Sequence, residues 1–230
     1  RNKIRHTVVP PLCEINPSFA DAVFRMTEIL QAEKEYLEAQ TDAYFVMRRE
    51  GDAVLFLIDA LAKMPLALRR RAVRRAVENF DEVELVLDLL KKRSGSAHTL
   101  SVGRVAEREY TDIAIYVPDI SEITPMRLPL KGEIVFGDYR IKIGQGGMHL
   151  PMKEYTVRTR QNGDSFAPEG MAGHKKVKDF LMDKKIPRRL RNRIPIITHM
   201  DKIAAVGNLR RSREFSNCDG ETMQIKIERI

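Results

Sequence analysis

The first part of the chain has the hydrophobic periodicity of helices. Apolar side chains recur at spacings of three, four and seven at Phe19, Val23, Met26, Leu30, Leu37, Tyr44 and Met47. This spacing predicts one long amphipathic helix. Asn16 can cap its start and Pro17 suits its first turn, whereas Gly51 and Asp52 predict its end near Glu50.

Two further helices are predicted before residue 95. The intervening apolar run AVLFLIDALAKM is compatible with a strand or with a buried helical turn, and both remain open. Pro65 opens the helix PLALRRRAVRRAVENF, and DEVELVLDLLKK forms the next. The expected buried face of the first of these comprises Ala72, Val73, Ala76, Val77 and Phe80.

From about residue 97 the period changes to that of strands. LSVGRVAEREYTDIAIYV, GEIVFGDYRIKIGQGG and YTVRTR all read as strands, and Asn162-Gly163 predicts a turn. Residues 174–194 return to a helical pattern in which Val177, Phe180 and Leu181 face inward and Pro187 restarts the helix. A hairpin over 194–207 and a final strand, MQIKIERI, complete the chain. The fold class expected is α + α/β multidomain: a helical middle domain followed by a small α+β C-terminal domain.

Composition narrows the class of protein. A hydrophobic content of 43% and a charged content of 31% predict a soluble, folded chain. There is no apolar run of about twenty residues and no signal-peptide pattern, so a cytoplasmic location is expected. Cys13 and Cys218 lack CxxC spacing, which favours two reduced thiols. The chain begins with Arg1 rather than Met, and we expect its natural start to lie upstream.

Positive charge is concentrated near the C-terminus. Residues 174–213 carry thirteen Lys and Arg against three acids, whereas the whole chain has a net charge of +8. The rest of the chain is therefore slightly acidic. Such a local excess is the electrostatic footprint of a phosphate-backbone partner.

Three groups of basic residues are candidates for binding RNA. Arg70, Arg71, Arg74 and Arg75 share one side of a helix, and a solvated face and an RNA contact are equally compatible with them. The strongest group lies in two successive helices: Lys175, Lys176 and Lys178 at the start of the first, and Arg188, Arg189, Arg191 and Arg193 in the second. Cations at a helix start oppose the helix dipole, whereas a phosphate bound there would be favourable. Arg158 and Arg160 lie on one strand face beside Asp164, for which the turn favours a structural role.

Motifs for catalysis and metal binding are missing. The chain has no GxxxxGK[ST] loop and no GxGxxG after a strand, and GQGG at 144–147 is expected to be a flexible loop. The five histidines lack metal-ligand spacing with a cysteine, so no metal is expected. Aromatic residues are not interleaved with the basic ones, which favours recognition of shape and backbone over base stacking.

Several stretches resemble one known family. RNKIRHTVVPPLCEINPSF resembles the end of the catalytic domain of bacterial tRNA(Ile)-lysidine synthetase, and LALRRRAVRRAVE resembles its middle domain. YTVRTRQNGDSFAPEGMAGHKKVKDFLMDKKIPRRLRNRIPI resembles its C-terminal tRNA-binding domain. The resemblance implies three parts: a catalytic-domain tail (1–16), a helical middle domain (17–95) and a tRNA-binding domain (96–230).

The resemblance also implies a function. The family uses ATP to adenylate the wobble cytidine of isoleucine tRNA with a CAU anticodon, and then attaches lysine. ATP, with magnesium, and lysine would bind the catalytic domain, whose SGGxDS loop is not in this chain, so no cofactor is expected here. The middle domain would lie along the anticodon stem and the last domain toward the acceptor stem. Arg1, Asn2 and Arg5 match a stretch that borders the catalytic pocket.

Two other interpretations remain open. The chain could be a non-enzymatic RNA-binding module, acting alone or with a separately encoded partner. It could also be an interaction protein in which the long amphipathic helix forms a homodimer.

Overall fold

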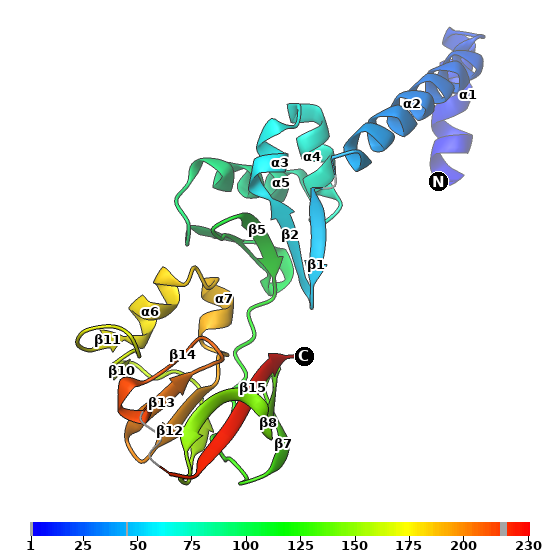
Figure 1. Ribbon diagram of the computed structural model, residues 1–230. Helices are drawn as coiled ribbons and strands as arrows, with labels where there is room; N and C mark the ends of the chain where they lie inside the picture. The colour runs from blue at the N-terminus through cyan, green and yellow to red at the C-terminus, as the bar shows by residue number, and fades with distance from the viewer. Residues whose placement is uncertain (1, 45, 217–219) are drawn as a thin grey trace. The chain divides into compact units, whose positions relative to one another are not determined.

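The chain folds into two compact units. The computed structural model describes residues 2–44, 46–216 and 220–230, and it divides the chain into Arg1–Val117 and Pro118–Ile230 (Figure 1). Each unit has its own hydrophobic core.

The first unit combines an N-terminal helical arm, three short helices and five strands. Its helices are a π-helical turn (Ile4–Val8), α1 (Val9–Ile15), α2 (Phe19–Asp42), α3 (Ile58–Lys63), α4 (Leu66–Arg74) and α5 (Phe80–Asp88), with 3₁₀ turns at Leu89–Lys91 and Ser101–Gly103. Its strands are β1 (Met47–Glu50), β2 (Ala53–Leu57), β3 (Ala97–Thr99), β4 (Val105–Arg108) and β5 (Asp112–Tyr116).

The five strands form one antiparallel sheet in the order β1-β2-β5-β4-β3. Phe56, Ile113 and Ile115 pack with buried residues of the helices, such as Leu61 and Val73. Because β3–β5 pair with β1–β2, the unit continues to Val117 and does not end near residue 95, where we expected the boundary. The middle region therefore contains both helices and a sheet. In the segment for which strand and helix were both possible, AVLFL forms β2 and IDALAK forms α3.

Helix α2 is shorter than its apolar pattern predicted. It ends at Asp42, and Met47–Glu50 forms β1, in which Glu50 pairs with Ala53. Gly51, with a φ of 57°, lies in the turn of this β1–β2 hairpin and does not terminate a helix. Phe80 also differs from expectation: it begins α5 and is 58% exposed.

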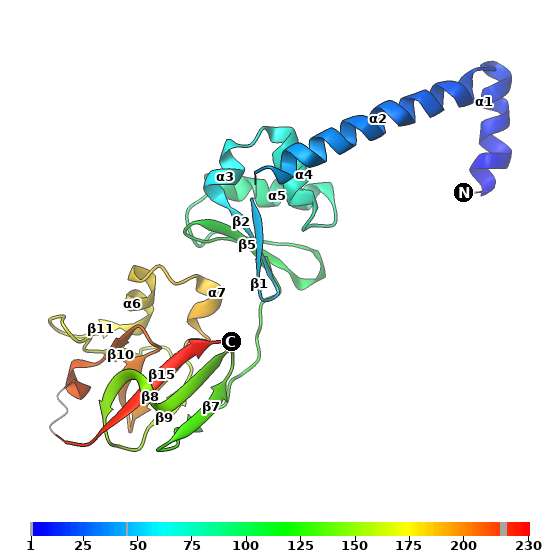
Figure 2. The ribbon, with the colours of Figure 1, turned by 45° about the vertical axis from the view of Figure 1, so that its right-hand side comes forward.

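The apolar stripe of α2 is covered only toward its C-terminal end. Leu37 packs against the core of the unit and Thr41 is buried. Leu30 and Met26, about two and three turns before Leu37, are each 53% exposed. Figure 2 shows this free part of α2 extending beyond α3–α5, with α1 at its far end.

The second unit is a layered α+β domain. Its strands are β6 (Met126–Arg127), β7 (Gly132–Phe136), β8 (Tyr139–Pro151), β9 (Thr156–Arg158), β10 (Ser165–Phe166), β11 (Lys175–Lys176), β12 (Ile196–His199), β13 (Lys202–Val206), β14 (Arg210–Arg211) and β15 (Thr222–Arg229). Its helices are α6 (Val177–Asp183), α7 (Arg188–Arg191) and a 3₁₀ turn (Arg213–Phe215).

Two sheets and a helix form three layers. The sheet β15-β8-β7 packs on one face of the sheet β14-β13-β12-β9-β6, with Ile141, Ile225 and Ile197 between them. On the other face of the five-stranded sheet, the predicted inward residues of α6 (Val177, Phe180 and Leu181) pack with Ile196 and Val206. The predicted hairpin at 194–207 and the final strand are confirmed as β12–β13 and β15.

Two expectations concern the membrane and the thiols. Among the described residues no helix has the length and apolar content that a membrane span needs. Cys13 is free, and Cys218 lies outside the described residues.

Candidate nucleic-acid interface

Four arginines in and directly after α4 have contacts within the first unit: Arg70, Arg71, Arg74 and Arg75. Arg71 and Arg75 face Glu38 and Asp42 of α2, with 3.4 Å between Arg71 Nη1 and Glu38 Oε1. Arg70 Nε donates to Glu84 Oε1 of α5 at 2.7 Å, and the guanidinium lies 5.3 Å from the centre of the Phe80 ring. Arg74 Nη1 donates to the Val77 carbonyl at 2.6 Å.

These pairs connect α2 to α4. Both the two arginines and the two acids are four residues apart, which is the spacing that places side chains on one helical face. The cluster therefore has a structural role, in that it holds the C-terminal turns of α2. The same four arginines line a hollow of about 480 Å³ with Glu38 and Phe80, and their contact with RNA stays a prediction.

Arg158 forms a nearly buried ion pair with Asp164. Arg158 Nη1 and Nη2 each donate to a carboxylate oxygen at 2.8 Å, and the two side chains are 15% and 10% exposed. The backbone N–H of Gln161 also donates to Asp164 at 2.8 Å. Burial raises the pKa of the Asp164 carboxyl, but the hydrogen bonds from Arg158 and Gln161 outweigh it, so the pKa lies below its ordinary value. Asp164 thus has the structural role expected of it. Arg158 shares this role, because its guanidinium is bound to the same carboxylate.

Arg160 and Arg193 also hold the second unit together. Arg160 Nη2 donates to Asn192 Oδ1 at 2.8 Å, which joins the end of β9 to the end of α7. Arg193 contacts Asp138 through Nε at 2.6 Å and Asp119 through Nη1 at 2.6 Å. The hydrogen bond with Asp138 raises the pKa of Arg193 although partial burial opposes it. Because it contacts both aspartates, Arg193 joins the loop before β6 to the β7–β8 turn, and its side chain is only 16% exposed.

The lysines around the start of α6 are more accessible. Lys175 pairs with Asp183. Lys176 and Lys178 are exposed, and their side chains have no hydrogen-bond or ion-pair partner among the described residues. The N–H of Val177, the first residue of α6, donates to the Asp164 carbonyl at 2.9 Å. One backbone N–H at the start of α6 therefore already has an acceptor within the unit. The exposed lysine charges are what this helix start can offer to a phosphate.

Helix α7 adds one exposed arginine to these lysines. Arg188 is exposed and, in the part of the chain that the structure describes, has no such partner. Arg189 and Arg191 are half-buried and have contacts within the chain, such as the hydrogen bond from Arg191 Nε to the Ile186 carbonyl at 2.9 Å. Lys184 and Lys185, between α6 and α7, are also exposed. These two lysines were not among the predicted RNA-binding residues, although they belong to the same basic run.

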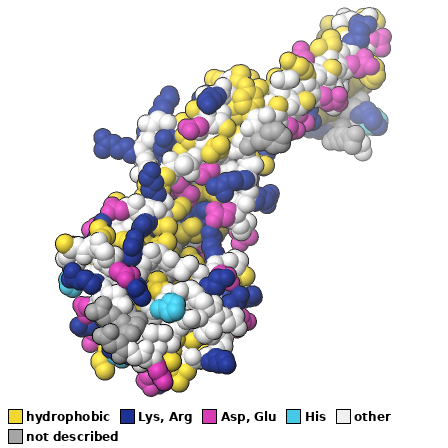
Figure 3. All heavy atoms as spheres, in the orientation of Figure 1, with side chains coloured by type: hydrophobic (Ala, Val, Ile, Leu, Met, Phe, Trp, Pro, Cys, Tyr) yellow, Lys and Arg dark blue, Asp and Glu magenta, His cyan; other side chains and the backbone are white. Residues whose placement is uncertain are grey.

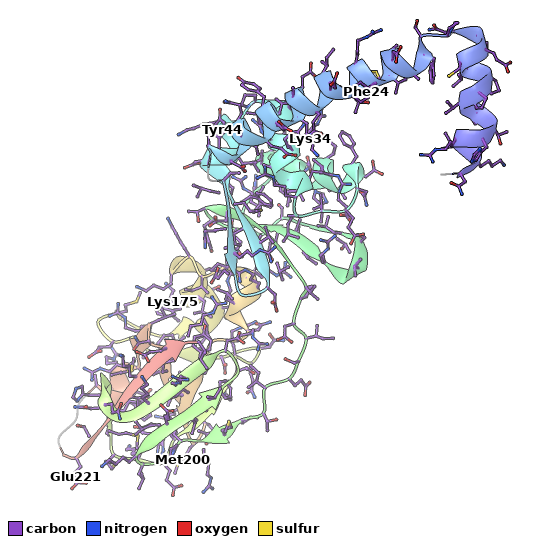
Figure 4. The ribbon with its side chains drawn as sticks, turned by 90° about the vertical axis from the view of Figure 1, so that its right-hand side faces the viewer. Phe24, Lys34, Tyr44, Lys175, Met200 and Glu221 are labelled. Atoms are coloured by element: carbon purple, nitrogen blue, oxygen red, sulfur yellow. The ribbon has the colours of Figure 1, made fainter. Side chains whose placement is uncertain are left out.

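The accessible cations come from neighbouring elements. Figures 1 and 2 both show β11, α6 and α7 along one side of the second unit, and Figure 4 labels Lys175 there. On the face shown in Figure 3, Lys and Arg are spread over the surface with acidic side chains among them. We define the exposed basic group of this unit as Lys176, Lys178, Lys184, Lys185 and Arg188. This group can attract phosphate without first breaking an internal ion pair.

The residues that match a pocket border lie in the N-terminal arm. Asn2 and Arg5 are exposed, and Arg1 lies outside the described residues. Among the residues that the structure describes, no three His, Cys, Asp or Glu side chains are grouped as metal ligands.

Part of the second unit matches a known domain family. Residues 155–227 match the family described as the TilS substrate C-terminal domain. A crystal structure of a TilS C-terminal domain aligns with 46% of this chain and 98% of its own, at 23% identity and a TM-score of 0.40.

Similarity to longer proteins covers nearly the whole chain. The tRNA(Ile)-lysidine synthase of Caldanaerobacter subterraneus subsp. tengcongensis is 31% identical over 99% of this chain and 55% of its own length. The enzyme of that name from Geobacter sulfurreducens is 30% identical over 92% of this chain and 52% of its own. The chain is therefore similar to tRNA(Ile)-lysidine synthases over nearly its whole length, and it spans about half the length of these relatives.

Proposed function

We propose that this chain is the tRNA-holding part of a tRNA(Ile)-lysidine synthase. The complete protein would be a cytoplasmic ligase that uses ATP to attach lysine to the wobble cytidine of isoleucine tRNA. ATP, magnesium and lysine would bind a separate catalytic domain, so this chain alone should bind tRNA without modifying it. Sequence similarity supports the proposal, because the curated relatives that carry this name match nearly the whole of this chain.

The exposed basic group of the second unit carries the proposal. Lys176, Lys178 and Arg188 have no acidic partner among the described residues, unlike the arginines of α4. Cations of this kind bind phosphates and release condensed counterions, so the affinity should depend on salt. Three such contacts would weaken tRNA binding roughly 20- to 40-fold between about 50 and about 200 mM salt.

Fluorescence anisotropy of labelled isoleucine tRNA at a series of salt concentrations measures this dependence. An affinity that stays constant over that range would contradict binding through phosphates. Methionine tRNA, with the same unmodified anticodon, is the comparison. Equal affinities for the two would assign their discrimination to the catalytic domain.

A second candidate function is suggested by the free part of α2. Met26, Ile29 and Leu30 are between 53% and 60% exposed. They continue the stripe whose other end is partly buried at Leu37, so a second copy of α2 could cover them and form a homodimer.

Sedimentation velocity at rising protein concentration tests the homodimer. Met26→Lys with Leu30→Lys should abolish concentration-dependent association, because it places two charges in the apolar stripe. Thr27→Lys with Gln31→Lys, on the polar side of the same turns, is the charge-matched control and should associate like the parent chain. A chain that remains monomeric at every concentration would rule out this candidate.

A further inference from the structure

The glycine-rich segment 144–147 is a fixed bulge, not the flexible loop expected from the sequence. Strand β15 pairs Ile225 with Ile143 and Gln224 with His149, so residues 144–148 bulge out of β8. Gly147 has a φ of 91°, and a Cβ at this position would lie 2.4 Å from the Ile225 carbonyl oxygen. The N–H of Gly146 donates to Gln224 Oε1 at 2.8 Å. The bulge is therefore held against β15 and requires glycine.

The bulge forms one wall of a hollow within the second unit. The hollow has a volume of about 430 Å³ and is lined by residues 147–149, residues 208–211 and Glu169. Its polar groups include the side chains of His149, Asn208, Arg210 and Arg211. None of these residues belongs to the exposed basic group defined above.

One of the two arginines is neutralised inside the unit. Arg211 Nε and Nη2 donate to the Glu169 carboxylate at 2.7 and 2.6 Å, and Nη1 donates to the His149 carbonyl at 2.9 Å. These hydrogen bonds hold the pKa of Glu169 below its ordinary value, although burial opposes them. The Glu169 carboxylate is thus occupied and its charge is balanced.

Arg210 lacks an equivalent partner. Its Nε is buried and has no hydrogen-bond acceptor within the described residues, and its Nη1 lies 3.4 Å from the Glu169 carbonyl. A buried donor without an acceptor is unfavourable, and a guanidinium keeps its charge at neutral pH. The hollow therefore has an unbalanced positive charge and an unused donor.

We propose that this hollow is an oxyanion site that takes a phosphate group, with the Arg210 guanidinium as its donor. A guanidinium offers a fork of N–H groups that matches phosphate oxygens. His149 and Asn208 can add hydrogen bonds from the wall. The phosphate can come from an RNA backbone or from a free phosphate ion. Only the first source rests on the proposed function.

The direct test follows the Nε–H resonance of Arg210 by NMR during titration of the whole chain with inorganic phosphate. Arg210→Lys identifies the resonance by its loss. We expect the shift to saturate with phosphate concentration. Arg210→Gln should bind phosphate at least about tenfold more weakly than the parent chain, because one charge-assisted interaction is removed. Arg127→Gln, which removes an exposed arginine outside the hollow, should bind phosphate like the parent chain.

The outcomes separate the two sources. If tRNA without added phosphate shifts the Arg210 resonance, and bound tRNA raises the phosphate concentration needed for half-saturation, the site takes an RNA phosphate. If tRNA binds but changes neither the Arg210 resonance nor the phosphate affinity, the site takes free phosphate and the proposed tRNA function still stands. An Arg210 resonance that does not respond to phosphate in the parent chain overturns the oxyanion site, whatever the stability of the variants.

Discussion

Lys176→Glu combined with Arg188→Glu is expected to weaken tRNA binding about 10- to 100-fold, because each change replaces a phosphate-binding cation by a repelling anion. The melting temperature should stay nearly unchanged, since neither side chain has a partner among the described residues. Anisotropy titration and thermal unfolding of the same preparations measure both quantities.

The control for this variant changes the net charge by the same amount elsewhere. Arg127 and Lys131 are exposed residues of the same unit, outside the exposed basic group. Arg127→Glu with Lys131→Glu should weaken tRNA binding much less if local contacts matter more than total charge. Equal losses in the two double variants would show a general electrostatic effect. A large loss of stability in Lys176→Glu with Arg188→Glu would instead mean that these side chains serve the fold.

Asp164→Ala is expected to destabilise the second unit by about 3 kcal/mol or more, because removal of one member of a buried ion pair leaves the other charge uncompensated. Arg158 is only 15% exposed, and Gln161 would also lose the acceptor of its backbone N–H. Urea denaturation monitored by circular dichroism measures the loss. Arg158→Met with Asp164→Leu should recover much of it, since a buried pair can be replaced by apolar side chains.

The pH dependence of stability gives a second view of the same pair. The pKa of Asp164 is lowered in the folded chain, so its stabilising contribution is complete above the ordinary carboxyl pKa of about 4. The contribution is lost as the pH falls further through the folded pKa. Asp164→Ala should thus differ most from the parent chain near neutral pH and converge with it in acid. A constant difference at all pH values would contradict the assigned ion pair.

Hydrophobic periodicity predicted most elements where one period was uninterrupted. Val177, Phe180 and Leu181 were expected inside, and all three are buried. The pattern failed at the end of α2, because Met47–Glu50 suits a helix locally and is a strand only through its pairing with β2. The boundary near residue 95 failed for a similar reason: β3–β5 join a sheet that begins more than forty residues earlier.

The availability of the candidate side chains could not be predicted from composition. Arg71 and Arg75 find acids on α2, and Arg193 finds Asp119 and Asp138, all of them distant in sequence. Only the fold distinguishes these paired arginines from the accessible Lys176 and Arg188. Glu38 and Asp42 have the same four-residue spacing as Arg71 and Arg75, which is compatible with two ion pairs between helices. This spacing predicts the pairs only once α2 and α4 are known to pack together.

The salt dependence of tRNA affinity in the parent chain and in Lys176→Glu with Arg188→Glu tests the central claim most directly. Each phosphate contact that is lost should lower the slope of log affinity against log salt by about one, so the slope should fall by about two. Parallel lines with the same slope would mean that neither side chain touches a phosphate, and the tRNA surface would have to lie elsewhere on the chain.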